Sequence, residues 1–149
     1  LFTQKRMGQN KQFFKLHKFR SMKMDTPHDV PTHQLENPDQ YITKVGKFIR
    51  AHSLDELPQL INILKGELSI IGPRPVIEEE LEKYGNNKEK FLSVTPGLTG
   101  YWAANGRSDT TYEQRMQMEL YYVDNISFKM DLKVFFKTII SVLKKEGAR

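Results

Sequence analysis

The sequence predicts an α+β fold: a small, mostly helical domain with a short β-hairpin near its N-terminus and an amphipathic helix near its C-terminus. Two aromatic-containing segments with a glycine turn between them predict the hairpin. Apolar residues at helical spacing recur over most of the remaining chain. A length of 149 residues suits one domain, with no internal repeat and no evident domain boundary.

The first third of the chain begins with the expected hairpin, over residues 2–22, which turns at Gly8-Gln9-Asn10. Residues 23–40 are rich in proline, histidine and aspartate and lack periodicity, so they predict a mobile loop. A short helix is expected over residues 41–52, because its apolar residues share one helical face.

The middle of the chain predicts two helices separated by a strand. The first helix runs through residues 57–64 and ends at Gly66, a usual helix-stop residue. Residues 68–71 predict a short buried strand. The second helix, over residues 76–90, is expected to be interrupted at Gly85-Asn86-Asn87.

The last third of the chain predicts a loop and two helices. Residues 96–100 form a turn-rich segment, Pro-Gly-Leu-Thr-Gly. Residues 110–113 have the Thr-x-x-Glu form of a capping box and predict the start of a helix that extends to about Val123. The final helix is expected from near Asp131 to about Lys145.

Composition excludes several classes of site. The absence of cysteine excludes disulfides, zinc–thiolate sites and thiol nucleophiles. The four histidines show no metal-ligand spacing, and no Walker or dinucleotide-binding glycine pattern is present. A net charge of +5 favours polyanionic partners such as phosphates, nucleotides or anionic lipid. The alternation of lysine and phenylalanine near residues 13–23 is more typical of a solvated strand face than of a nucleic-acid surface.

The densest chemical signal is the segment Ser53-Leu54-Asp55-Glu56-Leu57-Pro58-Gln59. Two adjacent carboxylates at a helix start can supply a nucleophile together with a metal ligand or an acid/base group. Ser53 and Glu56 also match a Ser-x-x-Glu capping box, the commoner use of such a pattern. Pro58 would then fall inside the helix and open its first turn, which suits an ion or phosphate site. Both interpretations stay open on pattern alone.

Two arginines lie in turns that suit phosphate binding. Prolines flank Arg74 on both sides, and a guanidinium group can make forked contacts with phosphate oxygens. Arg107 follows Gly106, which permits close backbone approach to a ligand. A strand-ending turn with a solvated arginine explains the Arg74 segment equally well.

The C-terminal helix combines an apolar stripe with lysines. The stripe suits a helix packed on the core. Phenylalanines flanked by lysines also suit a helix that lies at a membrane surface. Composition does not decide between them. The apolar residues are Leu132, Phe135, Phe136, Ile139, Ile140 and Leu143, and the lysines are Lys133, Lys137 and Lys144.

Taken together, these segments resemble the bacterial sugar transferase family, the monotopic polyprenyl-phosphate phosphoglycosyl transferases. The resemblance covers almost the whole chain, and its motifs occur in order, one of them 11 residues long. The motifs are Lys-Phe-Arg-Ser-Met at 18–22, Ser-Leu-Asp-Glu-Leu-Pro-Gln at 53–59, Lys-Gly-Glu-Leu-Ser-Ile-Ile-Gly-Pro-Arg-Pro at 65–75, Pro-Gly-Leu-Thr-Gly at 96–100 and Asn-Gly-Arg at 105–107.

The resemblance implies transfer of a sugar 1-phosphate from a UDP-sugar to undecaprenyl phosphate, which initiates polysaccharide or glycan assembly. Asp55 would attack the β-phosphorus, form a covalent phosphosugar–aspartate and expel UMP. Glu56, with Asp55, would bind Mg²⁺. The family positions that face phosphates and nucleotide are occupied here by Lys18, Arg50, Arg74 and Arg107, and Asp131 matches a further acidic position.

The resemblance also implies a location and marks two departures. Family members normally begin with a hydrophobic membrane helix. We therefore expect residues 1–149, which start at Leu1 without a methionine, to be the cytosolic catalytic domain of a truncated chain at the cytoplasmic face of the bacterial plasma membrane. Ala103-Ala104 stands where a Gln-Val pair is common. Glu119 stands where aspartate is usual, and no site role is assigned to it.

The alternative function is a non-catalytic basic module that binds anionic membrane or nucleic acid. Mg²⁺-dependent release of UMP from a UDP-sugar separates the two, since a binding module releases none. For the enzyme we expect no nucleic-acid partner beyond the nucleotide. Galactose, glucose and N-acetylated amino sugars are all open as the transferred sugar.

Overall fold

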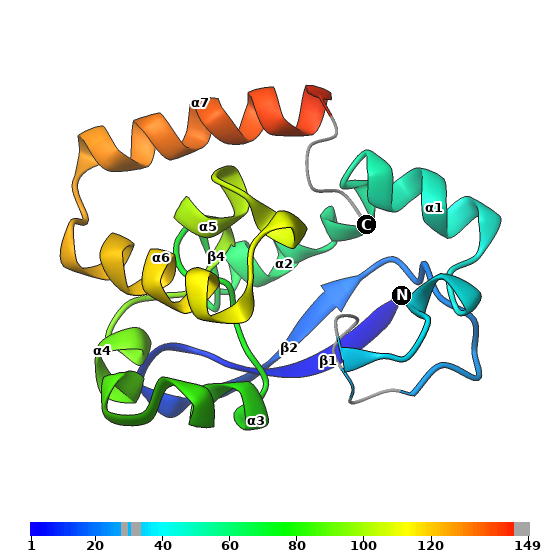
Figure 1. Cartoon of the computed structure of the whole chain (residues 1–149), viewed down its shortest axis with the longest axis horizontal. Coiled ribbons are helices and arrows are strands. Elements are labelled where there is room, and N and C mark those ends of the chain that lie inside the picture. The colour runs from blue at the N-terminus through cyan, green and yellow to red at the C-terminus, as the bar shows by residue number, and fades with distance from the viewer. Residues whose placement is uncertain (28–29, 31–33, 145–149) are drawn as a thin grey trace.

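The computed structural model describes residues 1–27, 30 and 34–144 and has the expected α+β fold. In Figure 1 the N-terminal hairpin lies toward one side and the longest helix, α7 (Phe128–Lys144), runs along the opposite side, with shorter helices between them. Among the described residues, none of the helices combines the length and apolar character needed to cross a bilayer.

The hairpin pairs β1 (Phe2–Met7) with β2 (Phe13–Lys18) in antiparallel register. A 3₁₀ turn, η1 (Gln9–Lys11), connects the strands, and Asn10 in it has a positive φ of 57°. Phe14 and Leu16 are buried on one face of β2, where Leu68 packs against them. The predicted hairpin is therefore confirmed, and its second strand ends at Lys18.

The segment after the hairpin is only partly described. The bridge between Met22 and Ile42 and a 3₁₀ turn, η3 (Pro38–Gln40), belong to it. The mobile loop predicted over residues 23–40 includes residues 28–29 and 31–33, which lie outside the described part of the chain.

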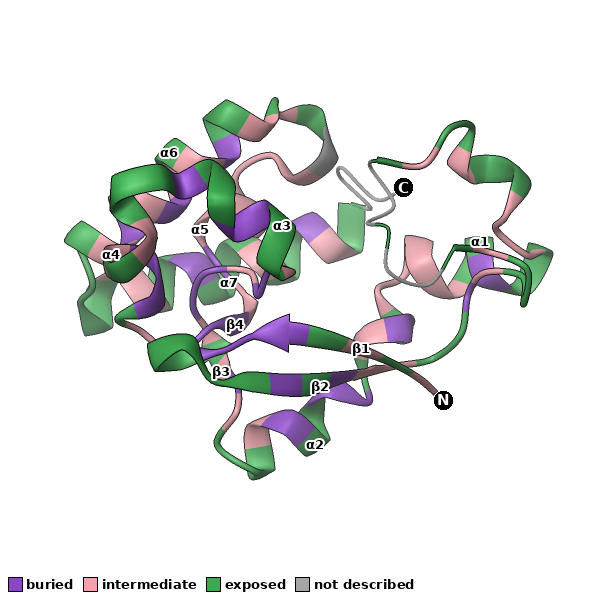
Figure 2. Cartoon of the chain, turned by 90° about the horizontal axis from the view of Figure 1, so that it is seen from below, coloured by how far each residue is buried: buried purple, intermediate pink, exposed green. Residues whose placement is uncertain are grey.

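Three short helical elements follow. Helix α1 (Lys44–Ala51) is capped by Thr43, whose hydroxyl accepts a hydrogen bond from the Gly46 amide at 2.8 Å. It is exposed or half-buried everywhere except Gly46 (Figure 2). A 3₁₀ turn, η4 (Leu54–Glu56), then leads into α2 (Gln59–Leu64). The predicted stop after α2 is confirmed by Gly66, which has a φ of +78°.

Helix α2 is attached to the hairpin by one buried amide. The Asn62 side chain accepts a hydrogen bond from the His17 amide at 3.1 Å and donates one to the Lys15 carbonyl at 2.7 Å. Both partners lie in β2, so the middle of α2 is held against the second half of that strand.

A second, parallel strand pair differs from the prediction in two ways. Strand β3 (Ser69–Ile71) is not buried: Ile70 is 52% exposed, and the buried residue is Leu68 just before it. Residues 97–99, expected as a loop, form strand β4 (Gly97–Thr99), which pairs with β3. Glycines allow this close approach, because a Cβ on Gly97 would lie 2.1 Å from the Gly72 nitrogen.

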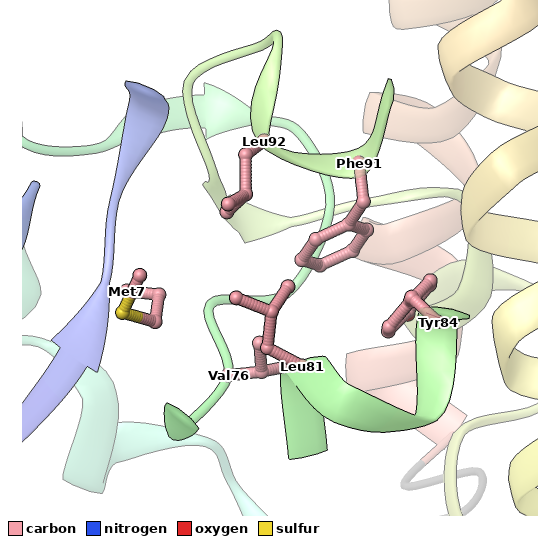
Figure 3. Close-up of a cluster of buried hydrophobic side chains, with 6 residues drawn as sticks. All are labelled: Met7, Val76, Leu81, Tyr84, Phe91 and Leu92. Carbon is pink, nitrogen blue, oxygen red and sulfur yellow. The ribbon is translucent and has the colours of Figure 1, made fainter. Parts of the chain in front are cut away.

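The main core cluster lies between β1 and the next helices, α3 (Glu78–Leu81), η5 (Glu82–Asn87) and α4 (Lys88–Leu92). The predicted interruption is confirmed by Gly85, which has a φ of +52°. Figure 3 shows the Tyr84 and Phe91 rings facing each other, with centroids 4.2 Å apart. The cluster consists of Met7, Val76, Leu81, Tyr84, Phe91 and Leu92.

The C-terminal part contains α5 (Tyr101–Ala104), η6 (Arg107–Asp109), α6 (Tyr112–Asp124) and α7. The capping box of α6 is one residue later than predicted: Thr111 and Gln114 exchange side-chain and backbone hydrogen bonds at 2.9 and 3.1 Å. Thr110 instead donates to the Arg107 carbonyl at 2.8 Å. Helix α7 begins at Phe128, three residues before the predicted start.

Candidate active site

A cavity of about 660 Å³ lies between the end of the hairpin, η4, the turn after β3, and helices α5 to α7. All but one of the predicted site residues line it: Lys18, Arg50, Asp55, Glu56, Arg74 and Arg107. The exception is Asp131, near the start of α7, which accepts a hydrogen bond from the Tyr122 hydroxyl at 2.7 Å. The structure thus brings together residues that are up to 89 positions apart in the chain.

The backbone around the two carboxylates does not form the capping box. Ser53 has a left-handed conformation with φ of 56°, and its side chain makes no capping hydrogen bond. The capping interpretation is therefore wrong. Pro58 lies between η4 and α2 rather than inside a helix, where its missing N–H costs no helical hydrogen bond. The Asp55 carbonyl accepts the Phe19 amide at 2.8 Å, which fixes the carboxylate pair beside the end of β2.

Glu56 is held in the ionised form by two cations. Its Oε1 lies 2.7 Å from the Arg74 guanidinium and 3.9 Å from the Lys18 ammonium. Burial alone would raise the pKa of Glu56, but the charges of Arg74 and Lys18 and the Arg74 hydrogen bond lower it to about 2. Glu56 is therefore a fixed negative charge in the cavity wall.

Asp55 is in a different electrostatic state although it is the next residue. Burial, and then the negative charge of Glu56, raise the pKa of Asp55, while Lys18, Arg50 and Arg74 oppose the rise. The ion pairs at this dyad involve Glu56, and within the described part of the chain none involves the Asp55 carboxylate. Asp55 lines the cavity beside three cations, a setting that suits a nucleophile.

The cations around the pair outnumber the acids. Burial, and then the Arg74 charge, lower the pKa of Lys18 to about 7. Burial also lowers the pKa of Arg50 and of Arg107. An anionic ligand with more than one charge would stabilise the charged forms of these cations. The cationic lining residues are Arg6, Lys18, Arg50, Arg74, Arg107 and Arg115, and the acidic ones are Asp55, Glu56 and Glu80.

The turn that carries Arg74 is built from two proline-containing segments. The Gly72 amide donates to the Thr99 carbonyl at 3.0 Å, and the Gly97 amide donates to the Pro73 carbonyl at 2.8 Å. These bonds extend the β3–β4 pair into the Gly72–Pro75 turn. The predicted Pro96–Gly100 segment therefore supports the arginine rather than forming a separate loop.

Sequence reasoning missed a second group of cavity residues. The carboxylate of Glu80, only 1% exposed, accepts a hydrogen bond from the Tyr112 hydroxyl at 2.7 Å and lies 3.7 Å from Arg115. The Arg115 guanidinium stacks over the Trp102 ring at 4.2 Å. Trp102 is the only tryptophan of the chain, but no periodicity or spacing in the sequence links it to Glu80. Such an aromatic and polar wall suits a sugar or a base next to a phosphate site.

Sequence reasoning also missed Glu119, which lies behind the cavity wall. Glu119, on α6, is 1% exposed, and its Oε2 accepts the Arg74 backbone amide at 2.6 Å. The resemblance assigned no site role to this position.

The mouth of the cavity is apolar and exposed. Helix α7 packs on α5 and β3 through its buried Val134, and Thr138 hydrogen-bonds Thr99 at 2.9 Å. Its stripe is nevertheless not covered: Phe136 is 60% exposed and Leu143 is 77% exposed. We call the exposed apolar residues that line the cavity the apolar rim; they are Leu57, Leu60, Ile70, Phe135 and Ile139.

Comparison with known proteins gives one family. The family model for "Bacterial sugar transferase" matches residues 1–145. The chain is 40% identical to the UDP-galactose-lipid carrier transferase of Erwinia amylovora and 38% identical to the undecaprenyl-phosphate galactose phosphotransferase of Salmonella typhimurium, in each case over 99% of this chain and 34% of the relative. It is 41% identical to the exopolysaccharide production protein ExoY of Sinorhizobium fredii, over 99% of this chain and 71% of that protein. The chain thus spans about a third of the length of the first two relatives.

Proposed function

Because the chain belongs to the bacterial sugar transferase family, we propose that it transfers a sugar 1-phosphate from a UDP-sugar to undecaprenyl phosphate and releases UMP. The names of two relatives supply the donor and acceptor classes, and that of a third places such a protein in exopolysaccharide production. The observation that carries the proposal is the Asp55–Glu56 pair: Glu56 forms ion pairs with Arg74 and Lys18, and among the described residues Asp55 forms none.

The cations would bind the diphosphate of the donor. One nitrogen of the Arg74 guanidinium forms an ion pair with Glu56, and its other N–H groups could bind a phosphate oxygen. Lys18, Arg50 and Arg107 line the same cavity. Burial, and to a smaller extent the Arg74 charge, lower the pKa of Lys18, Arg50 and Arg107, so a bound anion would stabilise their charged forms.

In the first step, a carboxylate oxygen of Asp55 would attack the phosphorus that carries the sugar. A new O–P bond forms, the bond from that phosphorus to the UMP oxygen breaks, and UMP leaves with the bonding electrons. In the second step, a phosphate oxygen of undecaprenyl phosphate attacks the same phosphorus and Asp55 leaves as a carboxylate. Lys18, Arg50 and Arg74 oppose the rise in the pKa of Asp55 and would keep it ionised for attack.

The residues present fit a Mg²⁺ ion that is shared with the substrate. Among the described residues, no cluster of three or more histidine, cysteine or acidic side chains would hold a metal alone. Asp55 and Glu56 offer hard carboxylate oxygens, although one oxygen of Glu56 is already taken by Arg74. Magnesium sites commonly use one or two carboxylates completed by substrate phosphates and water. When bound, the ion would neutralise diphosphate charge and stabilise the departing phosphate.

The acceptor and the membrane would meet the protein at the apolar rim. A polyprenyl phosphate has an anionic head and an apolar tail, and the cavity has a cationic interior with an exposed apolar mouth. Phe136, which is exposed on α7 next to the rim residue Phe135, adds to this apolar surface. We therefore assign the chain a catalytic role at the cytoplasmic face of the bacterial plasma membrane, with α7 on the lipid surface.

The test is UMP release in the presence of undecaprenyl phosphate, with UDP-galactose, UDP-glucose and an N-acetylated UDP-sugar in parallel. Asp55→Asn should reduce the rate on the order of 10³-fold or more, because it removes the nucleophile. Asp124→Asn, an exposed carboxylate paired with Lys90, is the matched control and should keep the wild-type rate. A near wild-type rate for Asp55→Asn would refute the assignment.

Two further measurements extend this test. Incubation with a UDP-sugar but no acceptor should add one sugar phosphate to the peptide that contains Asp55, detected by mass spectrometry. EDTA should stop UMP release, and added Mg²⁺ should restore it. A non-catalytic basic module would bind anionic vesicles or nucleic acid but release no UMP from any donor.

A further inference from the structure

Glu119 is a buried carboxylate that the mechanism above does not use. It lies on α6, is 1% exposed, and is absent from the residues that line the cavity. Burying a carboxylate is costly unless its oxygens are hydrogen-bonded. The Arg74 backbone amide donates a hydrogen bond to its Oε2 at 2.6 Å, and the Trp102 backbone lies near enough to oppose the rise in its pKa. Both belong to residues that line the cavity, so Glu119 joins two parts of its wall from behind.

The Arg74 amide needs such a partner because of the residues beside it. Pro73 and Pro75 have no N–H, so Arg74 supplies the only backbone donor of the Pro-Arg-Pro triplet. The neighbouring carbonyls are also bound: that of Pro73 accepts the Gly97 amide at 2.8 Å, and that of Pro75 accepts the Arg6 guanidinium at 3.1 Å. Three successive residues are thus held by β4, α6 and β1 respectively.

We propose that Glu119 is a positioning residue that fixes the backbone of Arg74, so that the guanidinium reaches both Glu56 and the diphosphate of the donor. The proposal rests on the proposed function for the identity of the ligand. The Glu119 carboxyl group suits the task because it presents an acceptor oxygen to the Arg74 amide. Arg115, one turn earlier on α6, offsets the buried charge.

The acceptor oxygen is needed in either protonation state. Burial raises the pKa of Glu119 to about 7, while the Arg115 charge and the Arg74 amide oppose the rise. A protonated carboxyl still has an acceptor oxygen for the Arg74 amide. Glutamine keeps that acceptor and nearly the same shape, whereas methionine keeps the volume and loses the acceptor. This pair of substitutions separates positioning from simple filling of space.

The experiment compares Glu119→Gln, Glu119→Met and the control Leu120→Ala. Leu120 is the next residue on α6 and packs on the core cluster, so its truncation destabilises the same helix without contacting Arg74. Donor KM comes from UMP release with UDP-galactose. Binding of UDP itself is followed by quenching of Trp102, which lines the cavity and is the chain's only tryptophan. Melting temperature is measured for all three variants.

Glu119→Met should raise the donor KM and the UDP dissociation constant roughly tenfold, because a hydrogen bond to a charged acceptor is lost and Arg74 is no longer fixed. Glu119→Gln should stay within about threefold of wild type in both constants. Leu120→Ala should lower the melting temperature and leave both constants within about twofold. Equal constants for the methionine variant and wild type would overturn the proposal.

A double-variant cycle tests whether Glu119 acts through Arg74. In an Arg74→Ala background, Glu119→Met should change UDP binding less than twofold, since the side chain that it positions is gone. An undiminished tenfold effect in that background would mean a general structural role and would also overturn the proposal. If Glu119→Met does not fold, Glu119→Ala replaces it, because the space left admits water to the exposed Arg74 amide.

Failure of the proposed reaction and failure of the positioning role give different results. UDP binding needs no turnover, so Asp55→Asn should bind UDP while releasing no UMP. If the wild type releases no UMP but the Glu119 and Arg74 effects on UDP binding are coupled, the proposed reaction is wrong and the positioning role stands. If UMP is released but the effects are independent, the positioning role is wrong and the reaction stands.

Discussion

Replacing Arg74 by lysine keeps the charge but removes the planar fork. In the structure the Arg74 side chain is 21% exposed, and one nitrogen lies 2.7 Å from Glu56. Glu56 and the flanking prolines hold this orientation, so the remaining N–H groups of the guanidinium are available for phosphate in a fixed direction. A lysine ammonium has one nitrogen and can serve either Glu56 or a phosphate oxygen well, but not both.

The expected cost follows from the loss of one charge-assisted hydrogen bond. Such a bond contributes about 1.5–3 kcal/mol, which corresponds to roughly 10- to 100-fold in kcat/KM for the donor. Stability should change much less, because a lysine at position 74 can still pair with Glu56. The Lys18 ammonium also lies 3.9 Å from the same Glu56 oxygen. We therefore expect Arg74→Lys to shift the melting temperature by only about 2 °C or less.

The assay measures kcat/KM for UDP-galactose at saturating undecaprenyl phosphate, together with thermal unfolding by circular dichroism. Arg20→Lys is the matched control: Arg20 is exposed, lies beside the Phe2 ring and does not line the main cavity. It should leave both quantities unchanged. If Arg74→Lys also stays within twofold of wild type in kcat/KM, the forked phosphate contact does not exist and Arg74 serves only to pair with Glu56.

Three further predictions follow from other parts of the fold. Gly97→Ala should lower the free energy of unfolding by about 1–3 kcal/mol in urea titrations, because the added Cβ would lie 2.1 Å from the Gly72 nitrogen, just after β3; an unchanged midpoint would refute the close approach. Phe135→Ser/Phe136→Ser should weaken co-sedimentation with anionic vesicles, whereas Phe13→Ser, on the hairpin, should not; equal binding of all three proteins would place α7 off the membrane. The folded pKa of Glu119, about 7, lies above its ordinary value of 4.5, so its contribution to stability is complete below pH 4.5 and is lost as the pH rises through 7. Glu119→Gln cannot ionise, and its melting temperature relative to wild type should therefore be higher at pH 8 than at pH 5; a constant difference would contradict the raised pKa.

Local patterns in the sequence predicted the elements that depend on local physics. The hairpin turn, the stop at Gly66 and the break at Gly85 each rest on a residue suited to unusual backbone angles. The C-terminal helix follows from its periodicity, with an error of three residues at its start. At Ser53 the same kind of reasoning failed, because the left-handed turn that places Asp55 beside the end of β2 outweighs the capping pattern.

The parts that sequence could not predict depend on contacts between distant segments. Strands β3 and β4 are three residues each, too short for a periodic signal, and they pair because glycines let their backbones approach. The hydrogen bond between Tyr112 and Glu80 joins residues 32 positions apart, and the one between Arg6 and Pro75 spans 69. The residues proposed to bind phosphate were identified by resemblance, whereas the cavity wall behind them could be identified only from the structure.

The same separation along the chain has a kinetic consequence. The turn that carries Arg74 is closed by bonds from β4, α6 and β1, which reach it across 24, 45 and 69 residues. Contacts between residues so far apart in the sequence form late in folding, because the entropy cost of closing such long loops is offset only when the other contacts have formed. A partly unfolded chain can therefore contain the hairpin and several helices while the proposed phosphate site is still unassembled. If Asp55 is the nucleophile, loss of activity should precede loss of helix content when the chain is gently denatured.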